Sequence, residues 1–201
     1  MRNGVCPLIL VVVLIRVCIG AAAAEELRLA PDHPLDFIDS DGRVVRSTDF
    51  PGKWVLIYFG YTHCADFCPT GLSVLANALD QIGPAAAHVQ PLFVTVDPER
   101  DKGEVLRDFT QAFDKRLIGL GGTVEQIKAA ATALGASFEQ VTQGSGYVID
   151  HSSAYVLIDP SHERAQTMRI AEPHVLAAKL IETMTKAGVA LDKVNNVGAY
   201  R

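Results

Sequence analysis

The feature that most restricts the fold of this chain is an unbroken apolar run from Trp54 to Phe59, with the sequence WVLIYF. Such a run predicts a strand that is buried on both faces, because a strand with one face in water alternates apolar and polar residues. A strand of that kind lies in a sheet that helices cover on both sides. The run therefore predicts the centre of an α/β domain.

The rest of the chain supplies the other elements of such a domain. Helices are predicted at Pro69–Ile82, Gly103–Phe113, Thr123–Leu134 and Pro173–Lys186, and strands at Val89–Val96, Leu117–Leu120 and Ala154–Ile158, the last with Ala165–Ile170 as its hairpin partner. Phe37 to Val45 predicts an N-terminal hairpin, and the segments 137–141 and 147–149 flank a glycine-rich turn. We predict one thioredoxin-like domain with this N-terminal hairpin and an inserted helix–strand segment.

Composition narrows the function. A length of 201 residues favours one domain with a full core. The net charge is −5, and the 18 Lys and Arg residues are spread along the chain. Nucleic-acid binding needs a basic face to neutralise phosphates, so no nucleic-acid partner is expected.

Residues 1–24 have the pattern of an export signal. A basic start is followed by a short apolar run and then by Ala21–Ala24, which suits cleavage after Ala24. An uncleaved anchor that associates with the inner membrane is the alternative, although Arg16 interrupts its apolar stretch. We therefore expect an exported, periplasmic protein with a domain at 31–187 and a loose tail at 188–201.

Two of the four cysteines, Cys6 and Cys18, belong to this leader. The other two, Cys64 and Cys68, are only four positions apart, so a disulfide between them would constrain little of the unfolded chain. The pair is a weak structural staple and suits chemistry better. It lies where a strand end meets a helix start, the usual location of sites in open α/β sheets.

The spacing of Cys64 and Cys68 permits either redox or metal chemistry. Residues at i and i+4 at a helix start place their sulfurs on one face, and the partial positive charge of a helix N-terminus favours thiolates. Two thiolates are too few for a structural zinc site but suit copper, especially Cu(I). His63 is adjacent to Cys64, yet neighbouring residues rarely converge, so we expect it outside the site.

The motifs around these cysteines resemble the Sco/SenC family. The resemblance covers most of residues 31–186 and rests on several separated motifs in the same order, namely YFGYTHCxxxCP at 58–69, VTVDPERD at 94–101, GLGGTVEQI at 119–127, DHS at 150–152 and the segment 155–160. The family is thioredoxin-like and helps to assemble the copper centre of cytochrome c oxidase. Ala65 stands where the family commonly has proline.

The resemblance implies a copper site formed by Cys64, Cys68 and His151, with Asp97 nearby as an outer partner. The position of His151 agrees, because in thioredoxin-like folds the loop before this strand faces the active cysteines. The expected function is a metallochaperone that delivers copper to an oxidase subunit. The alternative is a thiol-disulfide oxidoreductase that uses Cys64 and Cys68 with a redox partner and keeps the cysteines of the target reduced. Whether the chain is an enzyme stays open at this point.

Overall fold

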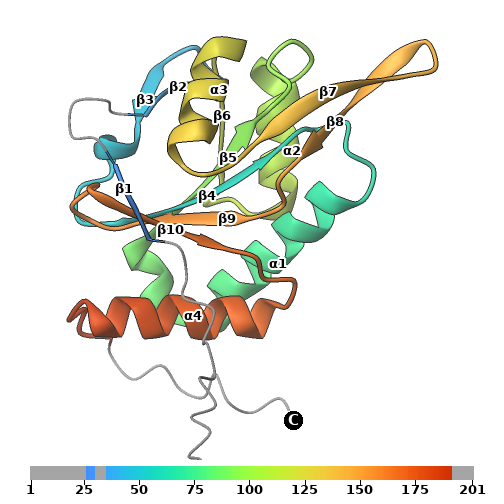
Figure 1. The fold of residues 1–201 in the computed structure, drawn as a ribbon. Coiled ribbons are helices and arrows are strands. Elements are labelled where there is room, and N and C mark those ends of the chain that lie inside the picture. The colour runs from blue at the N-terminus through green and yellow to red at the C-terminus, as the bar shows by residue number, and fades with distance from the viewer. Residues whose placement is uncertain (1–25, 30–34, 192–201) are drawn as a thin grey trace, which may run out of the picture.

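The structure is a computed structural model that describes residues 26–29 and 35–191 (Figure 1). Its strands are β1 (Glu26–Arg28), β2 (Asp36–Asp39), β3 (Val44–Arg46), β4 (Trp54–Gly60), β5 (Val89–Thr95), β6 (Ile118–Gly121), β7 (Phe138–Gln143), β8 (Gly146–His151), β9 (Tyr155–Ile158) and β10 (Arg164–Met168). Its helices are α1 (Phe67–Gln81), α2 (Gly103–Phe113), α3 (Val124–Ala133) and α4 (Pro173–Lys186), with short 3₁₀ turns at Ser47–Asp49 and Gly83–His88.

Eight of these strands form one mixed sheet in the order β1-β10-β9-β4-β5-β6-β2-β3. β4, β5 and β6 run parallel to one another, and the other neighbours pair antiparallel. β4 pairs with β5 along its whole length, from Trp54 opposite Val89 to Gly60 opposite Thr95. The C-terminal ends of the two strands therefore lie side by side. β7 and β8 form a separate two-stranded hairpin.

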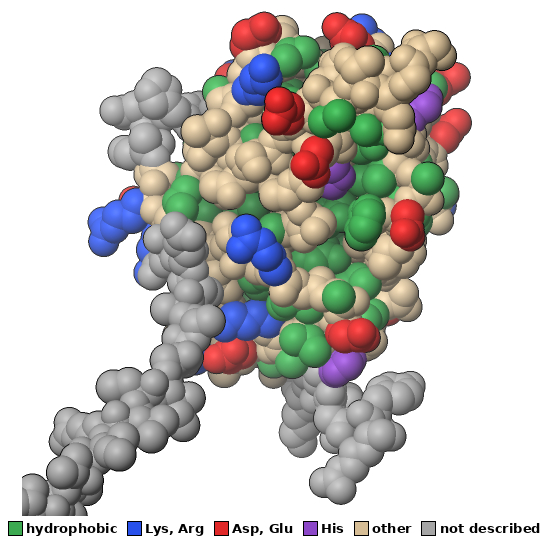
Figure 2. Space-filling view, turned by 45° about the vertical axis from the view of Figure 1, so that its right-hand side comes forward, with side chains coloured by type: hydrophobic (Ala, Val, Ile, Leu, Met, Phe, Trp, Pro, Cys, Tyr) green, Lys and Arg blue, Asp and Glu red, His purple; other side chains and the backbone are tan. Residues whose placement is uncertain are grey.

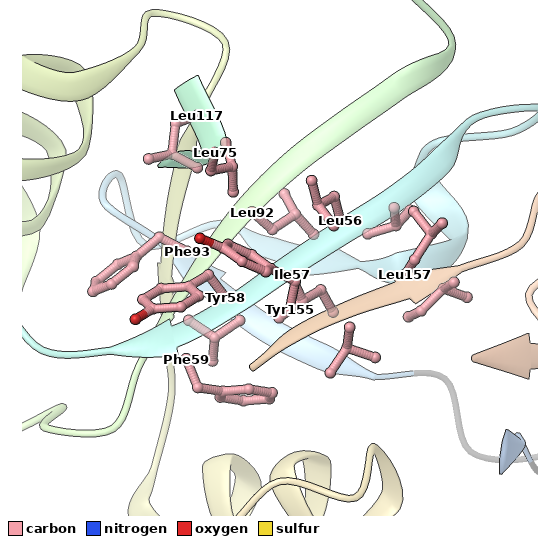
Figure 3. Close-up of a cluster of buried hydrophobic side chains, with 14 of the residues drawn as sticks. Leu56, Ile57, Tyr58, Phe59, Leu75, Leu92, Phe93, Leu117, Tyr155 and Leu157 are labelled. Carbon is pink, nitrogen blue, oxygen red and sulfur yellow. The ribbon is translucent and has the colours of Figure 1, made fainter. Parts of the chain in front are cut away.

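Helices cover both faces of the large sheet (Figure 1). α1 and α4 pack against each other on one face, and α3 lies on the other. Every residue of β4 is buried, as the unbroken apolar run predicts for a central strand. Figure 3 shows this core, where side chains of β4, β5 and β9 pack together with Leu75 of α1.

The predicted elements and the thioredoxin-like α/β class are confirmed, and α2 and α4 have the predicted bounds. Thr123 caps α3, since its hydroxyl accepts a hydrogen bond from the Gln126 amide. The predicted start of the first helix, Pro69, was late, because α1 begins at Phe67 and therefore already contains Cys68. β1 was not predicted, since three residues are too few to show a periodic pattern.

The predicted leader at 1–24 and most of the tail at 188–201 lie outside the described residues. Within the described part of the chain, no helix combines the length and apolar character that crossing a bilayer requires.

The close approach of α1 to β4 at Gly71 gives a stability prediction. Alanine ordinarily stabilises a helix interior relative to glycine by about 1 kcal/mol. A Cβ at Gly71, however, would overlap with the hydroxyl oxygen of the buried Tyr58. Gly71→Ala should therefore lower the free energy of unfolding by about 1–3 kcal/mol through overpacking, measured by urea denaturation.

The matched control for Gly71→Ala is Asn77→Ala, an exposed position in the same helix. It should change the free energy of unfolding by less than about 0.5 kcal/mol. Equal or greater stability of Gly71→Ala than of the natural protein would show that Tyr58 does not restrict this position.

Candidate metal centre

The segment between β4 and α1 carries both cysteines. Cys64 lies in the loop before the helix and is half-buried, whereas Cys68 lies in the first helical turn and is fully buried. The loop folds back so that the Cys64 amide donates to the Tyr61 carbonyl at 3.3 Å, and the Cys68 amide points at the Cys64 sulfur at 3.4 Å. Both cysteines are free thiols.

His151, at the end of β8, brings an imidazole to these sulfurs. Its Nε2 atom lies 3.2 Å from the Cys68 Sγ atom, and its Nδ1 atom lies 3.2 Å from the Ser152 carbonyl oxygen. Because a carbonyl oxygen only accepts hydrogen bonds, Nδ1 carries the proton and Nε2 keeps its lone pair toward the cysteines. The three candidate donor atoms all lie within 4.8 Å of one another.

Gly60 makes room for the Cys68 sulfur at the end of β4. A Cβ atom at this position would lie 2.9 Å from the Cys68 Sγ atom and 2.8 Å from the ring of Phe93. The Cys68 side chain thus lies against the end of β4, and the exposed fraction of Cys68 is 0%. Glycine is the residue that permits this close approach.

Burial controls the protonation of two of these groups. It raises the pKa of the Cys68 thiol well above its ordinary value, chiefly because the thiolate would lose its hydration. This loss of hydration opposes the stabilisation of a Cys68 thiolate that is predicted for a helix N-terminus. Burial also lowers the pKa of His151, so its imidazole is neutral at pH 7 and can act as a ligand.

A buried carboxylate anchors the cysteine loop. Asp101 accepts hydrogen bonds from the Thr62 amide at 2.8 Å, the Thr62 hydroxyl at 2.5 Å and the Thr95 hydroxyl at 2.6 Å. Its side chain has an exposed fraction of 0%. His63 turns toward this carboxylate, with 3.6 Å between its Nδ1 atom and an Asp101 oxygen, so it lies outside the sulfur–imidazole cluster as expected.

Asp97 holds the neighbouring hairpin. Its carboxylate accepts a hydrogen bond from the Tyr147 hydroxyl at 2.9 Å and pairs with the Arg100 guanidinium. Asp101, four positions further along the same turn, is also buried.

Tyr61, Thr62 and Tyr147 also contribute to the arrangement of the site, although none of them was predicted as a site residue. The DPERD motif could have signalled them, since a buried acidic residue needs donors near it. The identity of those donors depends on strand pairing.

Figure 2 brings forward the side of the molecule with the start of α1 and the β7–β8 hairpin, where hydrophobic side chains gather among acidic ones. Phe67, beside Cys68, is 70% exposed.

The sequence of the chain is similar to those of known proteins. The chain matches the sequence profile described as SCO1/SenC over residues 24–186. It is 41% identical over 142 residues to a mitochondrial SCO2 homologue of Bos taurus, which covers 68% of this chain and 53% of that protein. The chain thus spans about half the length of the curated relatives it matches.

Solved structures with the same fold are also found. Copper-bound ScoI of Arabidopsis thaliana has a TM-score of 0.71 and 32% identity, covering 77% of this chain and 98% of that one. BsSco, described with a disulfide switch and as a member of the Sco family of cytochrome c oxidase assembly proteins, has a TM-score of 0.63 and 19% identity, covering 84% and 97%. At that identity, the second likeness concerns the fold alone.

The lowered pKa of His151 gives a pH prediction. In the reduced, metal-free protein its ring should titrate below 6.5, the value for histidine in an unfolded peptide, because burial penalises the imidazolium. The unfolded chain then takes up this proton at a higher pH than the folded one. Stability contributed by His151 is therefore full above about pH 6.5 and is lost as the pH falls through the folded pKa.

An NMR titration of the ring carbons measures this midpoint, and His151→Gln identifies the resonance. The same variant should flatten the loss of stability between pH 6.5 and the folded pKa. A midpoint at or above 6.5 would contradict the stated effect of burial on this histidine.

Proposed function

This chain belongs to the SCO1/SenC family, and from that premise we propose that it is a copper metallochaperone. In this proposal Cys64, Cys68 and His151 bind the copper ion as cargo, and the protein delivers it to a copper-accepting subunit of cytochrome c oxidase. The observation that carries the proposal is the third donor, since the Nε2 atom of His151 lies 3.2 Å from a cysteine sulfur. Disulfide exchange needs only the two sulfurs.

The chemistry of the donors supports copper as the cargo. Thiolates are soft ligands that favour Cu(I), and imidazole also suits copper. Binding would displace the Cys68 proton, whose loss is costly in the metal-free site because burial raises the pKa of that thiol. Metal charge offsets that cost, since a coordinated thiol is deprotonated outright. Copper affinity should therefore rise with pH.

The exposure of the donors supports transfer. Cys64 lies in a loop and is only half-buried, whereas Cys68 has no exposed surface. An incoming ligand from an acceptor can therefore reach the metal from the Cys64 side while Cys68 and His151 still hold it. A three-donor set leaves a coordination position for that exchange.

The same difference in exposure favours thiol-disulfide exchange as a second candidate function. Cys64 is accessible to a partner disulfide, and Cys68 lies beside it to resolve the mixed disulfide. Each turnover would oxidise the two thiols to a Cys64–Cys68 disulfide and transfer their two electrons and two protons to the disulfide of the target, which becomes two thiols. The two functions use the same reduced cysteines.

The leading copper hypothesis predicts an effect specific to one histidine. Reduced natural protein should bind one copper ion per chain, with sulfur-to-copper charge-transfer bands for Cu(II). His151→Ala should weaken copper binding by about 100-fold or more, since loss of even an outer partner of a ligand costs 10–100-fold. Competition with a chelator for Cu(I) measures the affinity under anaerobic conditions.

His63→Ala is the matched control, because His63 is next to Cys64 but turns toward Asp101. It should bind copper like the natural protein. Equal affinity of His151→Ala and the natural protein would remove His151 from the site. No stoichiometric binding by the natural protein, together with ready exchange of Cys64 and Cys68 against a thiol partner, would favour the reductase.

Export is part of this proposal. The apolar leader at 1–24 supports a periplasmic location, and retention of the leader would attach the protein to the inner membrane. Cleavage after Ala24 should give a mature protein that begins at Glu25, which N-terminal sequencing of the protein from fractionated cells would detect. An intact N-terminus in the membrane fraction would favour the anchor, and an intact soluble protein in the cytoplasm would contradict export.

A further inference from the structure

The hairpin that carries His151 stands apart from the main sheet. Among the described residues, β7 and β8 form a ladder only with each other, from Phe138 opposite His151 to Gln143 opposite Gly146. Most of β7 is exposed, and the hairpin projects away from the main sheet (Figure 1). An isolated two-stranded hairpin is at best marginally stable in water. The position of His151 must therefore depend on contacts between this hairpin and the body of the domain.

Strand alternation points three residues of β8 toward that body. Tyr147, Ile149 and His151 occupy alternate positions and so share one face of the hairpin. Ile149 is buried, Tyr147 and His151 are half-buried, and the intervening Asp150 is exposed. A force that holds Tyr147 against the body therefore acts on the same face that carries the His151 imidazole.

Tyr147 is held by two kinds of interaction. Its hydroxyl donates to an Asp97 carboxylate oxygen at 2.9 Å, and the Arg100 guanidinium lies over its ring, 3.9 Å from the centroid. Arg100 pairs in turn with the other oxygen of Asp97. The exposed fraction of Asp97 is 3%, so this carboxylate is poorly hydrated and its hydrogen bonds are strong.

Asp97 is itself fixed by the backbone at the end of β5. Its amide donates to the Thr95 hydroxyl at 2.9 Å, and its carbonyl accepts from the amides of Arg100 at 3.2 Å and Asp101 at 3.0 Å. The carboxylate therefore belongs to a rigid turn of the body and does not move with the hairpin. Tyr147 is attached to a fixed point.

Tyr61 continues the contact from Tyr147 to His151. Its hydroxyl accepts a hydrogen bond from the Ile149 amide at 3.5 Å, and its ring meets the His151 ring edge-to-face at 5.9 Å between centroids. Arg100 also lies 5.9 Å from the Tyr61 centroid. The guanidinium thus stands between the tyrosine of the cysteine loop and the tyrosine of the hairpin.

We propose that Tyr147, Asp97 and Arg100 form a clamp that positions the β7–β8 hairpin so that the His151 imidazole faces Cys64 and Cys68. These three are positioning residues, since their side chains act on the imidazole through the hairpin and Tyr61 and none of them is a candidate donor. The effect on copper rests on the proposed function, whereas the effect on the hairpin does not. Opening of the clamp would withdraw one ligand and leave the two sulfurs in place.

Tyr147→Phe tests the clamp, because it keeps the ring over Arg100 and removes only the hydroxyl that binds Asp97. In the full-length, reduced, metal-free protein, amide hydrogen exchange at Ile149 and Asp150 should become faster, while the core amides of β4 stay as they are. Cu(I) affinity should fall about 10-fold, the lower end of the range for loss of an outer partner.

A double-mutant cycle separates positioning from general destabilisation. In the His151→Ala background, Tyr147→Phe should leave Cu(I) affinity unchanged, since the ligand that the clamp positions is already absent. Val148→Thr is the matched control, because the substitution keeps a β-branched side chain of similar shape on the opposite face of the same strand. It should alter neither affinity nor exchange by more than about twofold.

Three results would overturn the clamp, and one separates it from the copper hypothesis. Unchanged exchange at Ile149 in Tyr147→Phe would show that the hydroxyl does not hold the hairpin. Unchanged Cu(I) affinity in Tyr147→Phe, or an equal loss in the His151→Ala background, would show that the clamp does not act through His151. If the natural protein binds no copper but Tyr147→Phe still accelerates exchange, the copper hypothesis fails and the clamp stands.

Discussion

The parallel pairing of β4 with β5 is the constraint on which the site depends. It brings Gly60, where the cysteine loop begins, beside Thr95, where the acidic turn begins. Two carboxylates of that turn hold different elements of the site. Asp101 accepts a hydrogen bond from Thr62 of the cysteine loop, and Asp97 accepts one from Tyr147 of the hairpin. One turn of five residues thus connects the elements that carry the sulfurs and the imidazole.

Burial of these carboxylates explains why they can act as anchors. An exposed Asp would exchange its partners with water and contribute little, but a buried one must keep its donors or lose free energy. Asp101 has three such donors in addition to the nearby His63, and Asp97 has a tyrosine hydroxyl and a guanidinium. The same low hydration keeps Cys68 protonated and His151 neutral, so the metal-free site carries little charge of its own.

The candidate centre combines a sulfur ligand fixed in the main body with an imidazole ligand on a separate hairpin, which side-chain contacts hold against that body. Cys68 lies in α1, is fully buried and has its sulfur close to Gly60 of the main sheet. His151 lies on a hairpin that is bonded to the main body through the side chains of Tyr147 and Tyr61. Such a division suits a protein that must hold an ion firmly in one state and release a ligand in another, because a local opening costs less than global unfolding.

Much of the fold was readable from the sequence, because its signals are local. The apolar run at Trp54–Phe59 identified the central strand, Thr123 identified a helix start, and the CxxxC spacing narrowed the chemistry of the site to thiol redox chemistry or metal binding. The resemblance to a known family pointed to His151, which its local sequence would not have distinguished from a loop histidine. The tertiary structure decided the rest: the burial that raises the pKa of Cys68, the turn of His63 toward Asp101, and the attachment of Tyr147 to Asp97 across 50 positions of chain. These depend on strand order and register, which bring distant residues together and which no local pattern specifies.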